Sequence, residues 1–195
     1  MTDRADELAA FGYKLDDGFL EPGAARELQA AMRTAASEPV RVFNPQKGEW
    51  FDSDSVRSTR TVTVLEEVRE ALTARFVALL PELSEHFGVE LSSVEPLSFL
   101  RYLPGDHFVA HRDAEKQGAG EQSGRLVSLV FFVNDAAEFE GGELLICPFD
   151  VPEAFDLAID LQPRAGRLIA FPSHTLHQVL PVRRGERFSV VSWAR

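Results

Sequence analysis

The chain has 195 residues, 45% of them hydrophobic, and a formal net charge of -11. A chain of this length buries one hydrophobic core well and hardly two, so we expect a single domain over residues 1–195. The excess of acidic residues disfavours nucleic-acid binding, and no apolar run approaches the length of a membrane span.

Cysteine usage and the first residues bear on the cellular compartment. The sequence contains one cysteine, Cys147, which excludes an internal disulfide. Residues 1–7 are too polar to form a secretory signal peptide. We therefore expect a cytoplasmic protein, and the sequence does not indicate its oligomeric state.

The first half of the chain predicts two helices. The first should begin at Pro22, because proline is favoured in the first turn of a helix. Its apolar stripe consists of Ala24, Ala25, Leu28, Ala31, Met32 and Ala35. The stripe of the second helix consists of Val68, Leu72, Phe76, Leu79, Leu80 and Leu83. Residues 40–64, between the helices, combine turn residues with short β-prone pieces. We expect residues 1–94 to form a helical support and a lid region.

The second half of the chain predicts strands and turns. The candidate strands are residues 97–103, 108–113, 125–134, 143–147, 167–171, 176–182 and 186–192. The runs 126–133 and 188–193 are apolar on nearly both faces, which is typical of strands covered by a second sheet and by helices. Helices followed by many strands indicate an α+β fold whose strands close into a jelly roll, here over residues 95–195.

Two histidines and one aspartate in these strands form a candidate metal site. Residues i and i+2 of a strand point the same way, so His111 and Asp113 can share one metal while Arg112 points elsewhere. His177 would supply a third ligand from a neighbouring strand. This donor set is the facial triad of non-haem Fe(II) oxygenases, although it also suits Mn, Co or Zn. The pair His-x-Asp/Glu alone is a weak signal, since this composition produces one by chance roughly once.

A candidate anion site follows in the last predicted strand. Arg187 comes 10 residues after His177 and alternates with Ser189 on one face. Its guanidinium offers a fixed fork of N–H donors that suits a carboxylate. The alternative is a surface salt bridge with one of the 31 acidic residues. His107 and His174 lie near the candidate ligands but outside their pattern, so we expect supporting or loop roles for them.

These residues lie in motifs that resemble a known family. Residues 102–113, which begin with Tyr102 and end with Asp113, are similar to the Y-x-x-G-(x5)-H-x-D segment of the Fe(II)/2-oxoglutarate dioxygenases, in their prolyl 4-hydroxylase-like branch. Four further segments resemble that branch in the same order: 139–144 (F-x-G-G-E-L), 166–173 (G-R-x-x-x-F-P-S), 177–182 (H-x-V-x-P-V) and 185–189 (G-x-R-x-S). The resemblance runs from about Leu97 to Trp193, and it is looser in the first half of the chain.

The resemblance implies a fold and a set of cofactors. The fold is a double-stranded β-helix, a jelly-roll or cupin-like core backed by the N-terminal helices. The resemblance makes His111, Asp113 and His177 the catalytic Fe(II) ligands. It also implies 2-oxoglutarate and O2 as cosubstrates, with ascorbate as a further candidate. The distal carboxylate of 2-oxoglutarate would bind Arg187, with Tyr102 and Ser189 as hydroxyl donors.

The implied reaction is hydroxylation of an unactivated C–H bond, with succinate and CO2 as coproducts. The resemblance favours a peptidyl proline or another amino-acid residue as substrate, while free amino acids and natural-product intermediates stay open. A non-catalytic jelly roll that binds metal as a sensor or interaction module is a further alternative. The candidate substrate contacts are Trp50, Arg57 and Arg60, whose region corresponds to the substrate-covering loops of the family. Their alternative role is the decoration of a solvated hairpin.

Overall fold

The computed structural model describes residues 4–40, 42–44, 49–51, 55–114, 124–149 and 156–195. Its helices are α1 (Ala5–Ala10), α2 (Pro22–Thr34), α3 (Glu66–Ala78), α4 (Leu80–Phe87) and the short 3-10 helix η1 (Ala136–Glu138). None of these described helices is long and apolar enough to cross a membrane.

The helix expected at Pro22 is confirmed as α2, whereas the second apolar stripe is divided between α3 and α4. The division falls at Leu79, and Pro81 lies in the first turn of α4. Proline lacks an N–H group and its ring collides with the carbonyl four residues earlier, so one continuous helix is excluded. The sequence did not predict α1.

Two large antiparallel sheets contain most of the strands. The seven-stranded sheet has the order β1 (Lys14–Asp16), β13 (Leu168–Pro172), β9 (Val127–Phe132), β16 (Arg187–Ala194), β7 (Ser98–Tyr102), β6 (Arg60–Val62) and β2 (Ser37–Pro39). The five-stranded sheet has the order β12 (Ile159–Leu161), β11 (Leu144–Cys147), β14 (Leu176–Val179), β8 (His107–His111) and β5 (Arg57–Ser58). Two small pairs join β10 (Phe139–Gly141) to β15 (Val182–Gly185) and β3 (Val42–Asn44) to β4 (Glu49–Phe51).

Most predicted strands are found with small shifts at their ends, two of them end or divide differently, and the sequence did not predict β10 and β12. The strand expected at 108–113 ends at His111, so Asp113 follows it. The strand expected at 176–182 is divided into β14 and β15 around Pro181, which cannot donate a main-chain hydrogen bond to a sheet. Residues 1–94 supply β1, β2, β5 and β6 to the two large sheets, and so contribute more than helices and a lid.

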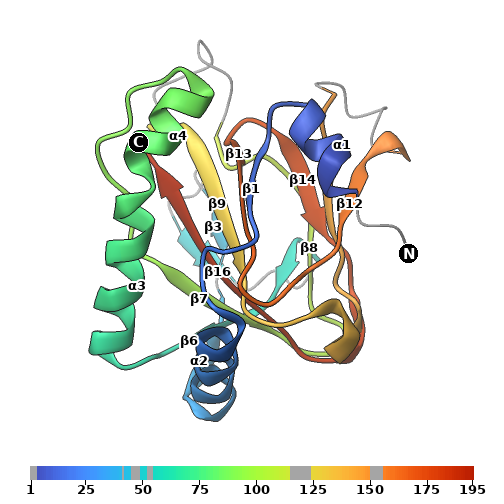
Figure 1. Cartoon of the computed structure of the whole chain (residues 1–195). Helices are drawn as coiled ribbons and strands as arrows, with labels where there is room; N and C mark the ends of the chain where they lie inside the picture. The colour runs from blue at the N-terminus through green and yellow to red at the C-terminus, as the bar shows by residue number, and fades with distance from the viewer. Residues whose placement is uncertain (1–3, 41, 45–48, 52–54, 115–123, 150–155) are drawn as a thin grey trace.

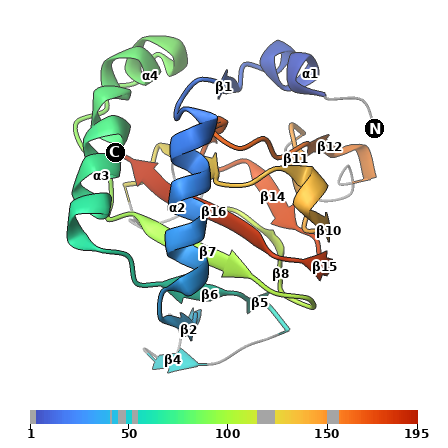
Figure 2. The ribbon, with the colours of Figure 1, turned by 60° about the horizontal axis from the view of Figure 1, so that its bottom comes forward.

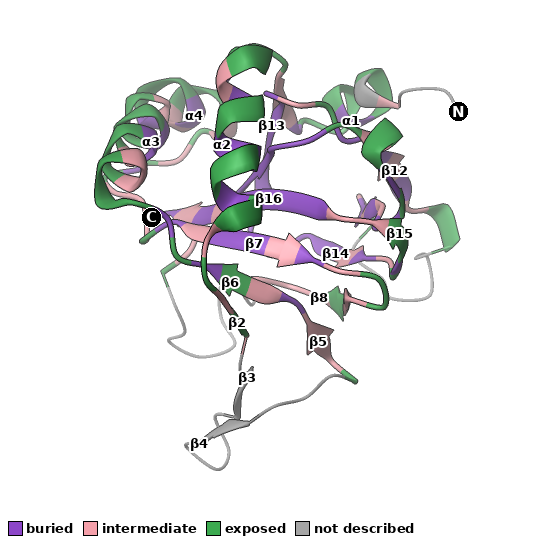
Figure 3. Ribbon diagram, turned by 90° about the horizontal axis from the view of Figure 1, so that it is seen from below, coloured by how far each residue is buried: buried purple, intermediate pink, exposed green. Residues whose placement is uncertain are grey.

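The molecule has three layers. Figures 1 and 2 show α2, α3 and α4 along one face of the seven-stranded sheet, and the five-stranded sheet on its other face. The alternation of β9 connects both layers: Leu129 and Phe131 pack with the helices, whereas Val130 and Phe132 pack with the five-stranded sheet. All six residues of β9 are buried, which confirms the expectation of a strand covered on both faces. Figure 3 shows that the neighbouring strand β16 is mostly buried as well.

One glycine holds the N-terminal segment against the sheet, and its substitution gives a test of this packing. Gly166 has a φ of 95°, and an added Cβ would collide with the carbonyl oxygen of Leu20. Gly166→Ala should therefore lower the free energy of unfolding by about 1–3 kcal/mol from backbone strain alone, and more from the collision.

Thermal unfolding followed by circular dichroism measures this effect, with Gly23→Ala in α2 as the control. Nothing lies within 4 Å of a Cβ at Gly23, so this control should be neutral or stabilising by up to about 1 kcal/mol. Equal melting temperatures for the two variants would contradict the packing.

Candidate functional site

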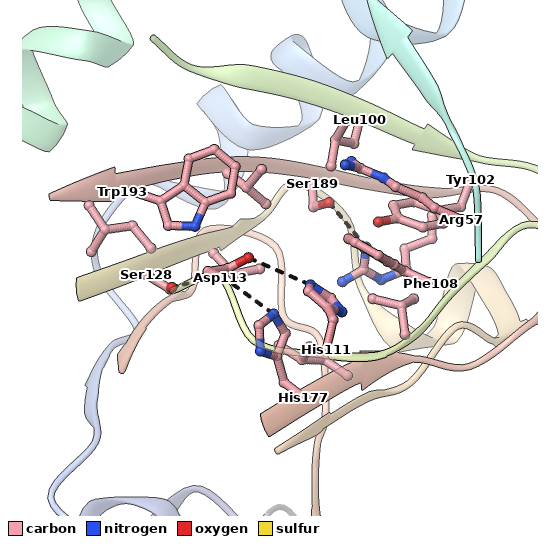
Figure 4. Close-up of a pocket in the computed structure, with 16 residues that line it drawn as sticks. Arg57, Leu100, Tyr102, Phe108, His111, Asp113, Ser128, His177, Ser189 and Trp193 are labelled. Carbon is pink, nitrogen blue, oxygen red and sulfur yellow. Dashed lines mark hydrogen bonds and ion pairs between the residues drawn. The ribbon is translucent and has the colours of Figure 1, made fainter. Parts of the chain in front are cut away.

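The candidate metal ligands meet between the two large sheets. His111 on β8 and His177 on β14 are directly opposite each other in the register of adjacent strands, and their ring centroids are 4.2 Å apart. Asp113 follows β8, where its backbone N–H donates to the carbonyl of Ser173 at 3.0 Å. One possible ligand atom from each of the three residues lies within 4.8 Å of the others. Figure 4 shows these three side chains pointing toward one another.

The hydrogen bonds of the two histidines fix which ring nitrogen faces the site. His111 Nδ1 lies 2.8 Å from the carbonyl oxygen of Val109, and His177 Nδ1 lies 3.0 Å from that of Thr175. A carbonyl oxygen can only accept, so in both rings Nδ1 carries a hydrogen, and in the neutral form of each ring Nε2 keeps its lone pair. The Nε2 atoms lie 3.6 Å and 3.5 Å from the carboxylate oxygens of Asp113. Both lone pairs are therefore available to a metal beside that carboxylate.

The local electrostatics favour the metal-binding form of each group. Burial opposes ionisation of Asp113, but its contacts with His111, His177 and Ser128 outweigh burial and lower the pKa of the carboxyl below its usual value. Burial and the nearby His111 lower the pKa of His177 to about 4, against the opposing effect of Asp113. At neutral pH the site offers a carboxylate and a neutral His177 imidazole, so neither group must lose a proton to bind a divalent metal.

Ser128 holds the Oδ2 oxygen of Asp113, and Ser173 in turn contacts Ser128. Ser128 on β9 donates from its hydroxyl to Asp113 Oδ2 at 2.7 Å, and its Oγ lies 3.0 Å from the Oγ of Ser173. Sequence reasoning missed both serines. The available signal was a lone polar residue in the apolar run 126–133, on the same strand face as Val130.

Aromatic rings support the histidines. Phe108 stacks on His111 with a centroid distance of 3.5 Å and an interplanar angle of 16°, and Phe171 meets His177 edge-on at 5.0 Å. These contacts restrict the orientation of both imidazoles. Beyond the apolar character of the strands, no pattern in the sequence predicted these two contacts.

The candidate anion site lies in the same pocket. Arg187 is 1% exposed, its Nη1 donates to Ser189 Oγ at 3.0 Å, and its guanidinium lies 4.9 Å from the ring centre of Tyr102. The Nε of Arg187 is buried without a hydrogen-bond partner, and no carboxylate of the described residues pairs with this guanidinium. Burial lowers the pKa of Arg187, partly offset by Tyr102. A buried cation without a counter-ion is costly, so this site favours an anionic ligand.

Arg57 and Arg60 differ in their relation to the pocket of the candidate metal ligands, although both line a second, neighbouring pocket. Arg57 lines the pocket that contains the three candidate metal ligands and Arg187. Arg60 is not among the lining residues, and its guanidinium donates instead to the side chain and the carbonyl of Ser37, at 3.0 Å and 2.9 Å. Trp50 belongs to β4, and its side chain lies outside what the structure describes.

The two other histidines near the motif lie outside the cluster of candidate ligands. His107 is at the start of β8, where its Nδ1 meets the carbonyl of Gly105 at 3.1 Å. His174 accepts a hydrogen bond from Arg112 through its backbone carbonyl.

Known proteins resemble this chain in sequence and in fold. Residues 97–195 match the 2OG-Fe(II) oxygenase superfamily. A PKHD-type hydroxylase of Synechococcus elongatus is 36% identical over 103 residues, which are 52% of this chain and 44% of that protein. A PKHD-type hydroxylase of Picosynechococcus is 34% identical over 140 residues, 71% of this chain and 57% of that protein. The chain thus spans about half the length of these curated relatives.

Solved structures share the fold over nearly the whole chain. A prolyl-4-hydroxylase of Pseudomonas putida superposes with a TM-score of 0.66 at 23% identity, covering 97% of this chain and 95% of that one. A prolyl hydroxylase of Trichoplax adhaerens, solved with a peptide fragment of hypoxia inducible factor, superposes with a TM-score of 0.71 at 14% identity, covering 97% and 86%. Because these identities are low, the two structures establish the fold alone.

Proposed function

The chain belongs to the 2OG-Fe(II) oxygenase superfamily, and from this membership we propose that it is an Fe(II)- and 2-oxoglutarate-dependent hydroxylase. One observation carries the proposal: a single pocket combines two imidazoles and a carboxylate with a buried, unpaired guanidinium. The two imidazoles and the carboxylate suit a divalent metal with open coordination positions. The guanidinium suits the distal carboxylate of a keto acid held on that metal.

Six residues of the pocket have a role in this proposal. His111, Asp113 and His177 would hold the iron, and Arg187 would bind the distal carboxylate of 2-oxoglutarate. Ser189 and Tyr102 would orient that carboxylate from the same wall, since the backbone of Tyr102 is directly opposite Arg187 in the register of β7 and β16. When bound, iron supplies the redox chemistry that activates O2. Overall, a substrate C–H bond, 2-oxoglutarate and O2 give an alcohol, succinate and CO2. Ascorbate would serve as an auxiliary reductant.

The fold is assigned on the same basis. We take the two large sheets as the double-stranded β-helix of the family, with its core at residues 95–195. The preceding residues would supply the supporting helices and the edge strands of the same single domain. The pocket lies between the sheets: the five-stranded sheet, with Asp113 just beyond its strand β8, supplies the candidate metal ligands, and the seven-stranded sheet supplies Arg187, Ser189 and Tyr102.

The names of the related proteins suggest the chemical class of substrate. PKHD-type and prolyl hydroxylases lead us to propose an amino-acid moiety, in a peptide or free, as the molecule that is hydroxylated. A natural-product intermediate with such a moiety fits the same site.

Succinate formation tests the proposed function. Folded protein incubated with Fe(II), 2-oxoglutarate and O2 should release succinate slowly without a substrate and faster with one. The additional succinate should equal the hydroxylated product in a 1:1 ratio. Absence of any iron-dependent succinate would contradict a hydroxylase and favour a non-catalytic metal-binding module.

The serine that holds Asp113 should affect metal binding. Ser128→Ala removes the hydrogen bond to Asp113 Oδ2, and loss of a partner that orients a ligand costs about 10–100-fold in metal affinity or activity. Titration with Fe(II) or Mn(II) under anaerobic conditions measures the affinity. Ser192→Ala is the matched control, because Ser192 is equally buried but donates to the carbonyl of Glu95, away from the pocket. Equal affinities of the two variants would contradict the role given to Ser128.

A further inference from the structure

We propose that Arg57 binds a carboxylate of the substrate, and that the substrate is a small molecule with a free carboxylate, such as a free amino acid. This inference rests on the proposed function and narrows it. It excludes as substrate an internal residue of a peptide, whose own carboxylate has become an uncharged amide.

Arg57 places a cation in the pocket, and only the ring of Phe108 separates it from the candidate metal ligand His111. Arg57 is directly opposite Phe108 in the register of β5 and β8, and its guanidinium lies 4.7 Å from the centre of the Phe108 ring. Phe108 in turn stacks on His111. Figure 4 shows the Phe108 ring between Arg57 and His111. A molecule held by Arg57 would therefore extend past Phe108 toward the metal site.

The charge of Arg57 is unpaired in a chain that has an excess of acids. Its Nε is buried without a hydrogen-bond partner, and none of the described carboxylates forms an ion pair with it. Other half-buried arginines have such partners: Arg125 pairs with Glu95 at 2.7 Å, and Arg101 pairs with Glu186 at 2.6 Å. Asp106 lines a second pocket with Arg57, but its carboxylate accepts from the Ser58 hydroxyl and the Leu103 N–H instead. Among the described residues the guanidinium of Arg57 is therefore open to an external anion.

The pocket contains two open cations, and the proposed cosubstrate needs one. Arg187 and Arg57 are the basic residues of the described lining, and 2-oxoglutarate uses Arg187 in the proposed function. Arg57 then remains for the substrate that is hydroxylated. The surrounding walls are mainly apolar, with Leu100, Val191 and Trp193 among them. An anionic group on an otherwise apolar body fits this combination, because a guanidinium binds a carboxylate through charge-assisted hydrogen bonds that an amide cannot match.

Binding measurements test this inference independently of turnover. L-Proline, L-leucine and L-phenylalanine, the carboxamide of each, and an acetylated and amidated prolyl peptide are titrated into the protein by calorimetry. The titrations are repeated without oxygen in the presence of Fe(II) and 2-oxoglutarate. We expect at least one free acid to bind, and its carboxamide to bind at least about tenfold more weakly.

The variants assign the effect to Arg57. Arg57→Gln should weaken binding of that acid by about tenfold or more and leave binding of the carboxamide unchanged. Arg60→Gln is the matched control, because Arg60 is bonded to Ser37 outside the pocket lining, and it should bind the acid as the wild type does.

Four results would overturn the inference: no binding by any of the acids, equal binding of acid and carboxamide, binding by the prolyl peptide alone, or an unchanged affinity in Arg57→Gln. A failure of the proposed function is separate, since it appears as absent iron-dependent succinate whatever the titrations give.

Discussion

Replacement of Asp113 by alanine is expected to abolish 2-oxoglutarate turnover and to weaken metal binding by more than about 100-fold. The carboxylate lies 3.6 Å and 3.5 Å from the two Nε2 atoms, so the variant would leave only the two imidazoles to bind the metal. This lower limit of 100-fold follows from a smaller change: removal of a partner that merely orients a metal ligand lowers metal affinity by about 10–100-fold. Removal of the ligand itself should cost more.

The measurement is Fe(II) affinity under anaerobic conditions together with succinate formation in air. His107→Ala is the matched control, since His107 lies on the same strand as His111 but bonds the carbonyl of Gly105. Near wild-type metal affinity in the folded Asp113 variant would mean that the metal binds elsewhere. An equal loss in the His107 variant would mean that the effect is not specific to the cluster.

Replacement of Arg187 by methionine is expected to weaken 2-oxoglutarate binding and to stabilise the protein at the same time. Each charge-assisted hydrogen bond contributes about 1.5–3 kcal/mol, so loss of the guanidinium should raise the dissociation constant by about 10- to 100-fold. In the absence of 2-oxoglutarate, Arg187 is a buried charge with an unpaired Nε between the rings of Tyr102 and Phe132. An apolar side chain of similar length removes that cost, so the free energy of unfolding should rise by about 1 kcal/mol or more.

Two measurements separate these effects: calorimetric titration with 2-oxoglutarate, and urea unfolding without it. A structural role for Arg187 predicts the opposite sign in the second measurement, because loss of a stabilising arginine would lower the free energy of unfolding. An unchanged dissociation constant for 2-oxoglutarate would remove Arg187 from the anion site.

More of the arrangement of the candidate site than of the fold could be predicted from the sequence. The spacing of His111, Asp113 and His177 predicted a shared site, and the register of β8 and β14 places the two histidines opposite each other. The alternation of side chains in one strand does not by itself explain the position of Asp113, because this residue lies beyond the end of β8. The backbone hydrogen bond from Asp113 to Ser173 holds it there, and such a contact between distant segments leaves no periodic signal.

The edge strands show why other features could not be predicted. Arg57 and Arg60 are three residues apart, yet β5 joins the five-stranded sheet and β6 joins the seven-stranded sheet. Because the chain passes from one sheet to the other at Thr59, one arginine reaches the pocket and the other bonds Ser37. Strands of two or three residues owe their existence to partners far along the chain rather than to local propensity. Ser128 and Phe108 were missed for a similar reason, since their roles depend on what faces them across the sheets.

The most direct test of the central claim is an anaerobic titration of the protein with Fe(II) and 2-oxoglutarate, followed by the weak visible charge-transfer band of the iron–keto acid chelate. We expect a band in the wild type, none in Asp113→Ala, and one that requires about 10- to 100-fold more 2-oxoglutarate in Arg187→Met. Absence of the band in folded wild-type protein, or a band that is indifferent to both substitutions, would contradict the assignment of this pocket as an iron and 2-oxoglutarate site.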